Sequence, residues 1–285
     1  MDAGLLSTLV IAVVVVILAP ILLGVWFARR WRVSWWGFFY GSLAWFVSQY
    51  ITRLPLLQVL GPTIANQLSQ SVWYKYGWFL FLALSAGLFE EGGRYLGYRF
   101  FEKDRQISPR LTLPKMVKTW PQALMYGAGH AWVEAFFLVG LPLALQIASC
   151  IYAFQTDPTA LAPDQALLIN QSREACSLTV WWVPLLGMLE RLMSLAIHIS
   201  LSVLVLQVFI RSKGYWWWLA VGYHALTNLV AVALGDALTK VLSYEAAILI
   251  TEAAVLLFAL FSLWLIWRLR PRTEELDTDQ LTIGD

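Results

Sequence analysis

The chain has 285 residues, of which 59% are hydrophobic and only 13% are charged. A soluble domain carries about 25% charged residues, so this composition argues against a soluble globular protein. A formal net charge of +2 and the lack of a basic stripe, a P-loop or a GxGxxG motif give no support for binding nucleic acid or a nucleotide. We therefore expect a multi-pass protein of the cell membrane, in contact with the lipid bilayer.

Seven apolar stretches are long enough for a membrane span of roughly 20 residues. They cover residues 5–28, 34–54, 73–98, 120–148, 179–210, 214–234 and 244–268. The first has an apolar core too long for a signal peptide, so we predict that it is a retained span. The sequence thus predicts an all-α, polytopic helical membrane protein with about seven transmembrane helices. Residues 1–270 would form a single transmembrane domain, and residues 271–285 a disordered, acidic cytoplasmic tail.

Lysine and arginine are distributed unequally between the two sides of these spans. Fourteen lie in the loops and tail of one side, and only Arg53, Lys75, Arg173 and Lys240 lie on the other. The positive-inside rule then predicts an N-terminus outside and a cytoplasmic C-terminus. The polar insert 149–178 has the composition of a loop, and this topology places it outside. Its two flanking cysteines, Cys150 and Cys176, are either a disulfide or two free thiols.

Ionisable side chains gather in four of the predicted spans. A charged residue at mid-span costs at least ~2.5–3.5 kcal/mol on insertion scales, so each is a functional candidate. At 1.5 Å per residue, Glu90 and the three histidines all lie roughly 13–18 Å from the cytoplasmic ends of their helices. We therefore expect one polar bundle within residues 73–234, around a cavity that opens to the cytoplasm. The candidates are Glu90, Glu91, Arg94, His130, Glu134, Glu190, Arg191, His198, His224 and Asn228.

Several chemistries suit such a layer. A buried carboxylate can act as general base toward water, imidazoles can position that water, and an amide or His N–H can stabilise an oxyanion. Zn²⁺ could instead bind with one position open for water, and its ligands would be His130, His198, His224 and Glu90. The HExxH pattern of ordinary zincins is absent. The pairs Glu91–Arg94 and Glu190–Arg191 could also be ion pairs that only lock helices together.

Four motifs in combination carry a family resemblance: EEGGR at 90–94, GAGHAWVEA at 127–135, ER at 190–191 followed by HIS at 198–200, and HALTN at 224–228. Together they resemble the YhfC family of intramembrane peptidases. That family is similar to the wider superfamily of CAAX prenyl proteases, bacteriocin-processing (CPBP) proteases and PrsW. The resemblance implies an intramembrane endopeptidase that cleaves a membrane-embedded or membrane-proximal protein or peptide by a glutamic-type mechanism, without a required cofactor.

The resemblance also implies roles for individual residues. Glu90 would activate the water, with Glu91 and Arg94 in support. His130 would orient that water, and His224 with Asn228 would form the oxyanion site. Glu134, Glu190 and Arg191 are supporting residues, and His198 stays open between a catalytic residue and a metal ligand. Two other classes remain as alternatives, namely a proton- or metal-ion-coupled transporter and an inactive membrane scaffold.

Overall fold

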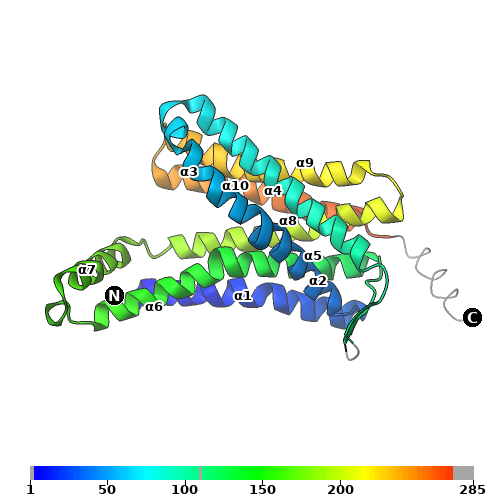
Figure 1. The fold of residues 1–285 in the computed structure, drawn as a ribbon, viewed down its shortest axis with the longest axis horizontal. Coiled ribbons are helices and arrows are strands. Elements are labelled where there is room, and N and C mark those ends of the chain that lie inside the picture. Colours follow the sequence, from blue (N-terminus) through cyan, green and yellow to red (C-terminus); the bar gives the residue numbers. More distant parts are fainter. Residues whose placement is uncertain (1–2, 109–110, 272–285) are drawn as a thin grey trace, which may run out of the picture.

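The computed structural model describes residues 3–108 and 111–271, so the predicted tail beyond Pro271 lies outside the described residues. Helices α1 (Ala3–Trp31), α4 (Val72–Phe100), α5 (Trp120–Ala135), α8 (Val183–Ile210), α9 (Tyr215–Leu238) and α10 (Tyr244–Arg268) form an elongated bundle (Figure 1). The antiparallel strands β1 (Arg105–Ser108) and β2 (Leu111–Leu113) lie at the end where the described chain finishes. The N-terminus lies at the opposite end.

Helical segments occupy all seven stretches in which spans were predicted. Within residues 3–108 and 111–271, five helices are long and apolar enough to cross a membrane: Gly4–Trp31, Trp120–Gln155, Val183–Ile210, Tyr215–Leu238 and Tyr244–Arg268. The helices over 34–54 and 73–98 are less apolar, the second because it carries the charged residues at 90, 91 and 94. Seven crossings and the orientation of the termini therefore stay predictions.

Two helices contain a π-helical segment immediately before a proline. The segment η1 (Phe46–Arg53) joins α2 (Trp36–Trp45) to α3 (Leu54–Gln70), and η2 (Phe136–Gly140) joins α5 to α6 (Leu141–Gln155). Each ends two residues before a proline, at Pro55 and Pro142. A proline lacks the N–H and its ring clashes with the carbonyl of the preceding turn. The wider π turn accommodates both defects, so each helical path continues through its proline.

The insert 149–178 is helical, which corrects the loop predicted there. Helix α6 continues to Gln155, and after the short 3₁₀ turn η3 (Pro158–Ala160) the chain forms α7 (Pro163–Leu178). A proline in the first turn, an early Asp164 and several Ala, Leu and Gln residues favour this helix despite its polarity. A disulfide between Cys150 and Cys176 ties α6 to α7, which decides between the two alternatives for these cysteines.

Glycines let the helices that carry the polar residues approach at backbone distance. A Cβ on Gly87 of α4 would lie 2.7 Å from the carbonyl oxygen of Val221 on α9. One on Gly127 of α5 would lie 2.5 Å from the Cα of Ile199 on α8. These contacts stand within one turn of Glu90, His130, His198 and His224, so they set the distance between the polar side chains.

We predict that Gly87→Ala destabilises the protein by about 1–3 kcal/mol, because the added methyl group meets a backbone carbonyl that cannot rotate away. Gly92→Ala on the same helix is the matched control, because its Cβ would meet nothing within 4 Å. Thermal unfolding in detergent would compare the two. Equal melting temperatures would show that α4 and α9 are not held at backbone contact.

The topology predicts opposite accessibility for two exposed positions, Ser108 in β1 and Gln165 in α7. A cysteine at 108 should react with an impermeant thiol reagent only from the cytoplasmic side, and one at 165 only from outside. The native Cys150 and Cys176 should stay unlabelled until they are reduced. Labelling of both introduced cysteines from one side would contradict an odd number of crossings between them and the charge-based orientation.

Candidate active site

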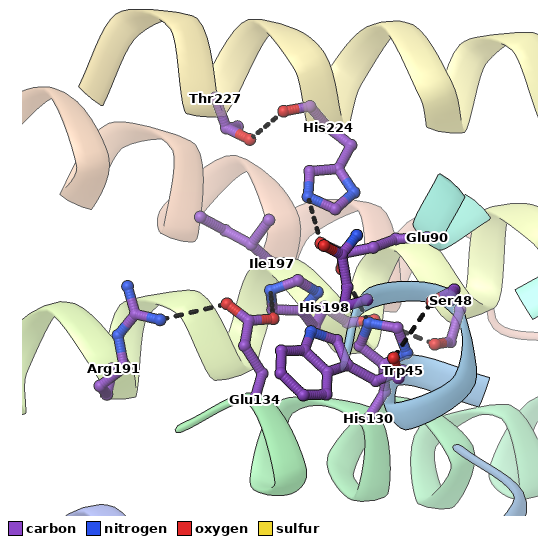
Figure 2. A network of polar contacts seen from close by, with 12 residues as sticks. Trp45, Ser48, Glu90, His130, Glu134, Arg191, Ile197, His198, His224 and Thr227 are labelled. Carbon is purple, nitrogen blue, oxygen red and sulfur yellow. Dashed lines mark hydrogen bonds and ion pairs between the residues drawn. The ribbon is translucent and has the colours of Figure 1, made fainter. Parts of the chain in front are cut away.

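Four helices bring the predicted polar residues into one cluster (Figure 2). Glu90 on α4 contacts His130 on α5, with 2.9 Å between Oε2 and Nε2. The His198 ring on α8 lies 5.1 Å from the His130 ring, and the His224 ring on α9 lies 5.4 Å from that of His198. All four side chains are buried. The equal depth predicted from the sequence therefore corresponds to direct proximity.

Arg94 is the hub of the cluster. It is fully buried, and its guanidinium forms an ion pair with the equally buried Glu91. It also donates to Nδ1 of His198 at 2.6 Å. The Glu91–Arg94 ion pair is one that the sequence offered as a possibility, at i,i+3 spacing. Glu91 in turn lies 2.7 Å from Nδ1 of His224, so one ion pair orients two histidines.

These contacts fix which ring nitrogens carry protons. A guanidinium only donates, so Nδ1 of His198 must accept, and the neutral ring carries its proton on Nε2. That Nε2 lies 2.8 Å from Oε2 of Glu134, which accepts no hydrogen bond in the described structure. Glu91, ionised by Arg94, accepts from Nδ1–H of His224. The Nε2 lone pair of His224 is then free, 3.9 Å from Oε1 of Glu90.

A second layer of polar residues lies one helical turn beyond the histidines. It is on the side away from the end of the bundle that carries most lysines and arginines (the basic end). Arg191 donates to Glu134 at 3.1 Å and forms an ion pair with Glu190. Asn228 lines the same cavity as these three residues. Glu134, Glu190 and Arg191, predicted as supporting residues, thus line one cavity together with His224. The ion pairs of Arg191 also neutralise its charge.

A cavity of about 390 Å³ reaches this cluster. It is lined by Glu90, His224 and Asn228, and it extends along Leu57, Phe79 and other residues on the side of the cluster away from the basic end. The sequence predicted a cavity that opens to the cytoplasm, whereas this one extends toward the other end if the charge-based orientation holds. The wall formed by Trp45, Gln49 and Arg53 was missed, because Arg53 was counted as a loop residue. The regular spacing of these three residues along one helix was the available signal.

A metal ion would find a suitable donor set here. Glu90, His130, Glu134 and His198 each offer one ligand atom, and these atoms all lie within 4.8 Å of one another. Two imidazoles and two carboxylates match the ligands of Zn²⁺, and the buried Nδ1 of His130 has no hydrogen-bond partner in the described structure. The ligand set predicted from the sequence had His224 in the place of Glu134. In the structure, Nδ1 of His224 is turned to Glu91 instead.

Comparisons with known proteins point to one family. The model of a family described as YhfC intramembrane metalloprotease matches residues 15–262. The uncharacterized membrane protein YhfC of Bacillus subtilis (strain 168) is 33% identical over 227 residues, which cover 75% of this chain and 79% of that protein. No solved structure shows a significant match to the chain. The matched range includes every residue of the polar cluster.

We predict that Glu91→Gln destabilises the fold by about 3–5 kcal/mol, because it leaves the buried guanidinium of Arg94 without a counter-ion. The double variant Glu91→Gln/Arg94→Met should recover much of this loss, since no buried charge remains unpaired. Glu190→Gln is the matched control: its side chain is 38% exposed and Arg191 keeps Glu134, so the change should stay within about 1 kcal/mol. Unfolding in detergent would measure all three. A double variant that is less stable than Glu91→Gln alone would contradict this explanation by the ion pair.

Proposed function

Because the chain belongs to the YhfC intramembrane metalloprotease family, we propose that it is an endopeptidase that hydrolyses a peptide bond of a membrane-embedded or membrane-proximal protein. One observation carries the proposal. A buried carboxylate, Glu90, contacts one imidazole and faces the lone pair of another at the end of a cavity between helices. This is the arrangement that general-base attack by water requires.

In the proposed reaction, Glu90 takes a proton from water while the water oxygen bonds to the scissile carbonyl carbon. His130, which contacts Oε2 of Glu90, orients that water. The carbonyl oxygen becomes an oxyanion that Asn228 and His224 stabilise. His224 would donate from Nε2 when it carries a second proton, with Glu91 as the partner of its Nδ1–H. Transfer of a proton to the amide nitrogen then breaks the C–N bond.

A metal variant uses the same residues. Glu90, His130, Glu134 and His198 would hold a Zn²⁺ ion, which when bound would polarise water and a substrate carbonyl. Glu91 keeps its orienting role toward His224 in either variant. The transporter and scaffold alternatives differ from both, because neither requires a peptide bond to break.

We predict that Glu90→Gln lowers cleavage by at least ~10², because the general base is lost. The melting temperature should change little, since Glu90 has no arginine or lysine partner among the described residues. Glu252→Gln on α10 is the control, as that carboxylate is not among the residues that line the cavity. The readout is the set of new protein termini in membranes that express wild type, either variant or no enzyme, measured by mass spectrometry.

New termini that form with the Glu90→Gln variant but not in membranes without the enzyme would contradict the role of Glu90 as the base. If no terminus depends on the wild-type enzyme, the peptidase proposal itself fails. Metal analysis of purified wild type and His130→Ala separates the two variants of mechanism. One ion per chain, lost in His130→Ala together with activity, would assign the metal site. Full activity of metal-free protein in the presence of a chelator would leave Glu90 as the sole activator of water.

A further inference from the structure

One wall of the active-site cavity consists of hydrogen-bond donors. Trp45, Gln49 and Arg53 follow one another at i, i+4 and i+8 along α2 and η1, and all three line the cavity that contains Glu90. An indole N–H, an amide NH₂ and a guanidinium thus face the space in which a substrate would lie. Figure 2 shows Trp45 among the residues of the polar cluster.

Two of these donors lack a partner. Nε1 of Trp45 and Nε2 of Gln49 are buried, in side chains that are 1% and 2% exposed, and neither has a hydrogen-bond partner in the described structure. The amide of Gln49 cannot turn over to remove this defect, because its Oε1 accepts from Arg53 at 3.0 Å. Buried donors are nearly always satisfied in proteins, so this pair in a cavity wall is available to acceptors inside the cavity, from a substrate or from water.

Arg53 adds a charge that the described residues do not neutralise. It donates to Oγ of Ser85 at 3.1 Å, to Gln49, and to the carbonyl of Leu82 at 2.7 Å, all of which are neutral acceptors. Within residues 3–108 and 111–271 it forms no ion pair, whereas Arg191 across the cavity is paired with two carboxylates. Three of its five N–H groups are used, so the rigid guanidinium retains donors for an anion.

We infer that Trp45, Gln49 and Arg53 bind the substrate, with Arg53 taking a carboxylate and the other two taking carbonyl oxygens near the cleaved bond. This assignment rests on the proposed peptidase activity. The distance along the cavity locates the carboxylate. Ser85, which contacts Arg53, precedes Glu90 by five residues on α4, or about 7.5 Å of helix. An extended chain covers that length in about two residues, so the acidic group lies two to three residues from the cleaved bond.

The carboxylate can come from a side chain or from the C-terminus of a substrate, and a peptide set distinguishes the two. The set shares one apolar single-span sequence and carries Glu, Gln or Lys at successive positions, each with a free or an amidated C-terminus. Wild type in proteoliposomes should cleave Glu peptides at least tenfold faster, in kcat/KM, than Gln peptides, with Glu two to three residues from the cut. If amidation instead removes the preference, the anchor is the terminal carboxylate.

The variants test whether Arg53 provides this selectivity. Arg53→Gln should abolish the preference for Glu while it still cleaves the Gln peptide, and Arg53→Glu should favour the Lys peptide. Gln49→Leu should raise KM for all peptides alike, because it removes a donor but no charge. Arg173→Gln is the matched control, since Arg173 also donates to backbone carbonyls but lies in α7, outside the cavity. It should keep the preference of wild type.

A binding measurement keeps this inference separate from the peptidase proposal. In the Glu90→Gln background, the Glu peptide should bind about tenfold more tightly than the Gln peptide, and Arg53→Lys should retain part of that difference. If the peptides bind in a charge-dependent way but wild type does not cleave them, the peptidase proposal fails and the binding role of the wall stands. Three results would overturn the proposed role of this wall in binding. They are equal cleavage of the Glu, Gln and Lys peptides, a preference for Glu that survives Arg53→Gln in folded protein, and peptides that neither bind nor react.

Discussion

The site depends on one buried ion pair, between Arg94 and Glu91 on α4. Neither side chain has any exposure, so each charge is tolerable only because the other is present. The pair also reaches two other helices, since Arg94 donates to His198 on α8 and Glu91 accepts from His224 on α9. A single electrostatic requirement therefore sets the rotation of three helices relative to one another. Glu90, which takes no part in the pair, is left free to face His130 and the cavity.

The walls around this pair follow from two opposite backbone features. Glycines at 87 and 127 let α4 meet α9, and α5 meet α8, at backbone distance, which closes the cluster on the side of the histidines. On the other side, the π-helical turns before Pro55 and Pro142 rotate the residues that precede them. Trp45, Gln49 and Arg53 come into register along the cavity through the first of these turns. Close packing holds the reacting groups, and the wider turns provide the space beside them.

The sequence predicted the helices and the polar layer because both are local signals. Apolar length defines a helix, and an ionisable residue inside it is costly enough to mark a site. The Glu91–Arg94 pair was within reach of local spacing, whereas the contacts of these two residues with His198 and His224 on other helices were not predicted. The direction of the cavity depends on how α3 and α9, which both line it, pack against α4, and no single stretch of the sequence encodes this packing. The helix α7 was missed because its polarity resembles that of a loop, although its residues are good helix formers.

The proton on His198 links the ion pair to the choice of mechanism. Arg94 donates to Nδ1, so the neutral ring holds its proton on Nε2, the nitrogen that faces Glu134. Water activation by Glu90 alone leaves this arrangement undisturbed, with His198 as a support for Glu134. Coordination of a metal through Nε2 requires that proton to leave, either outright or by a move to Nδ1 after Arg94 withdraws from it. A metal at this site therefore competes with the interaction that positions its own ligands, whereas His224, oriented by Glu91 through Nδ1, already presents a free Nε2.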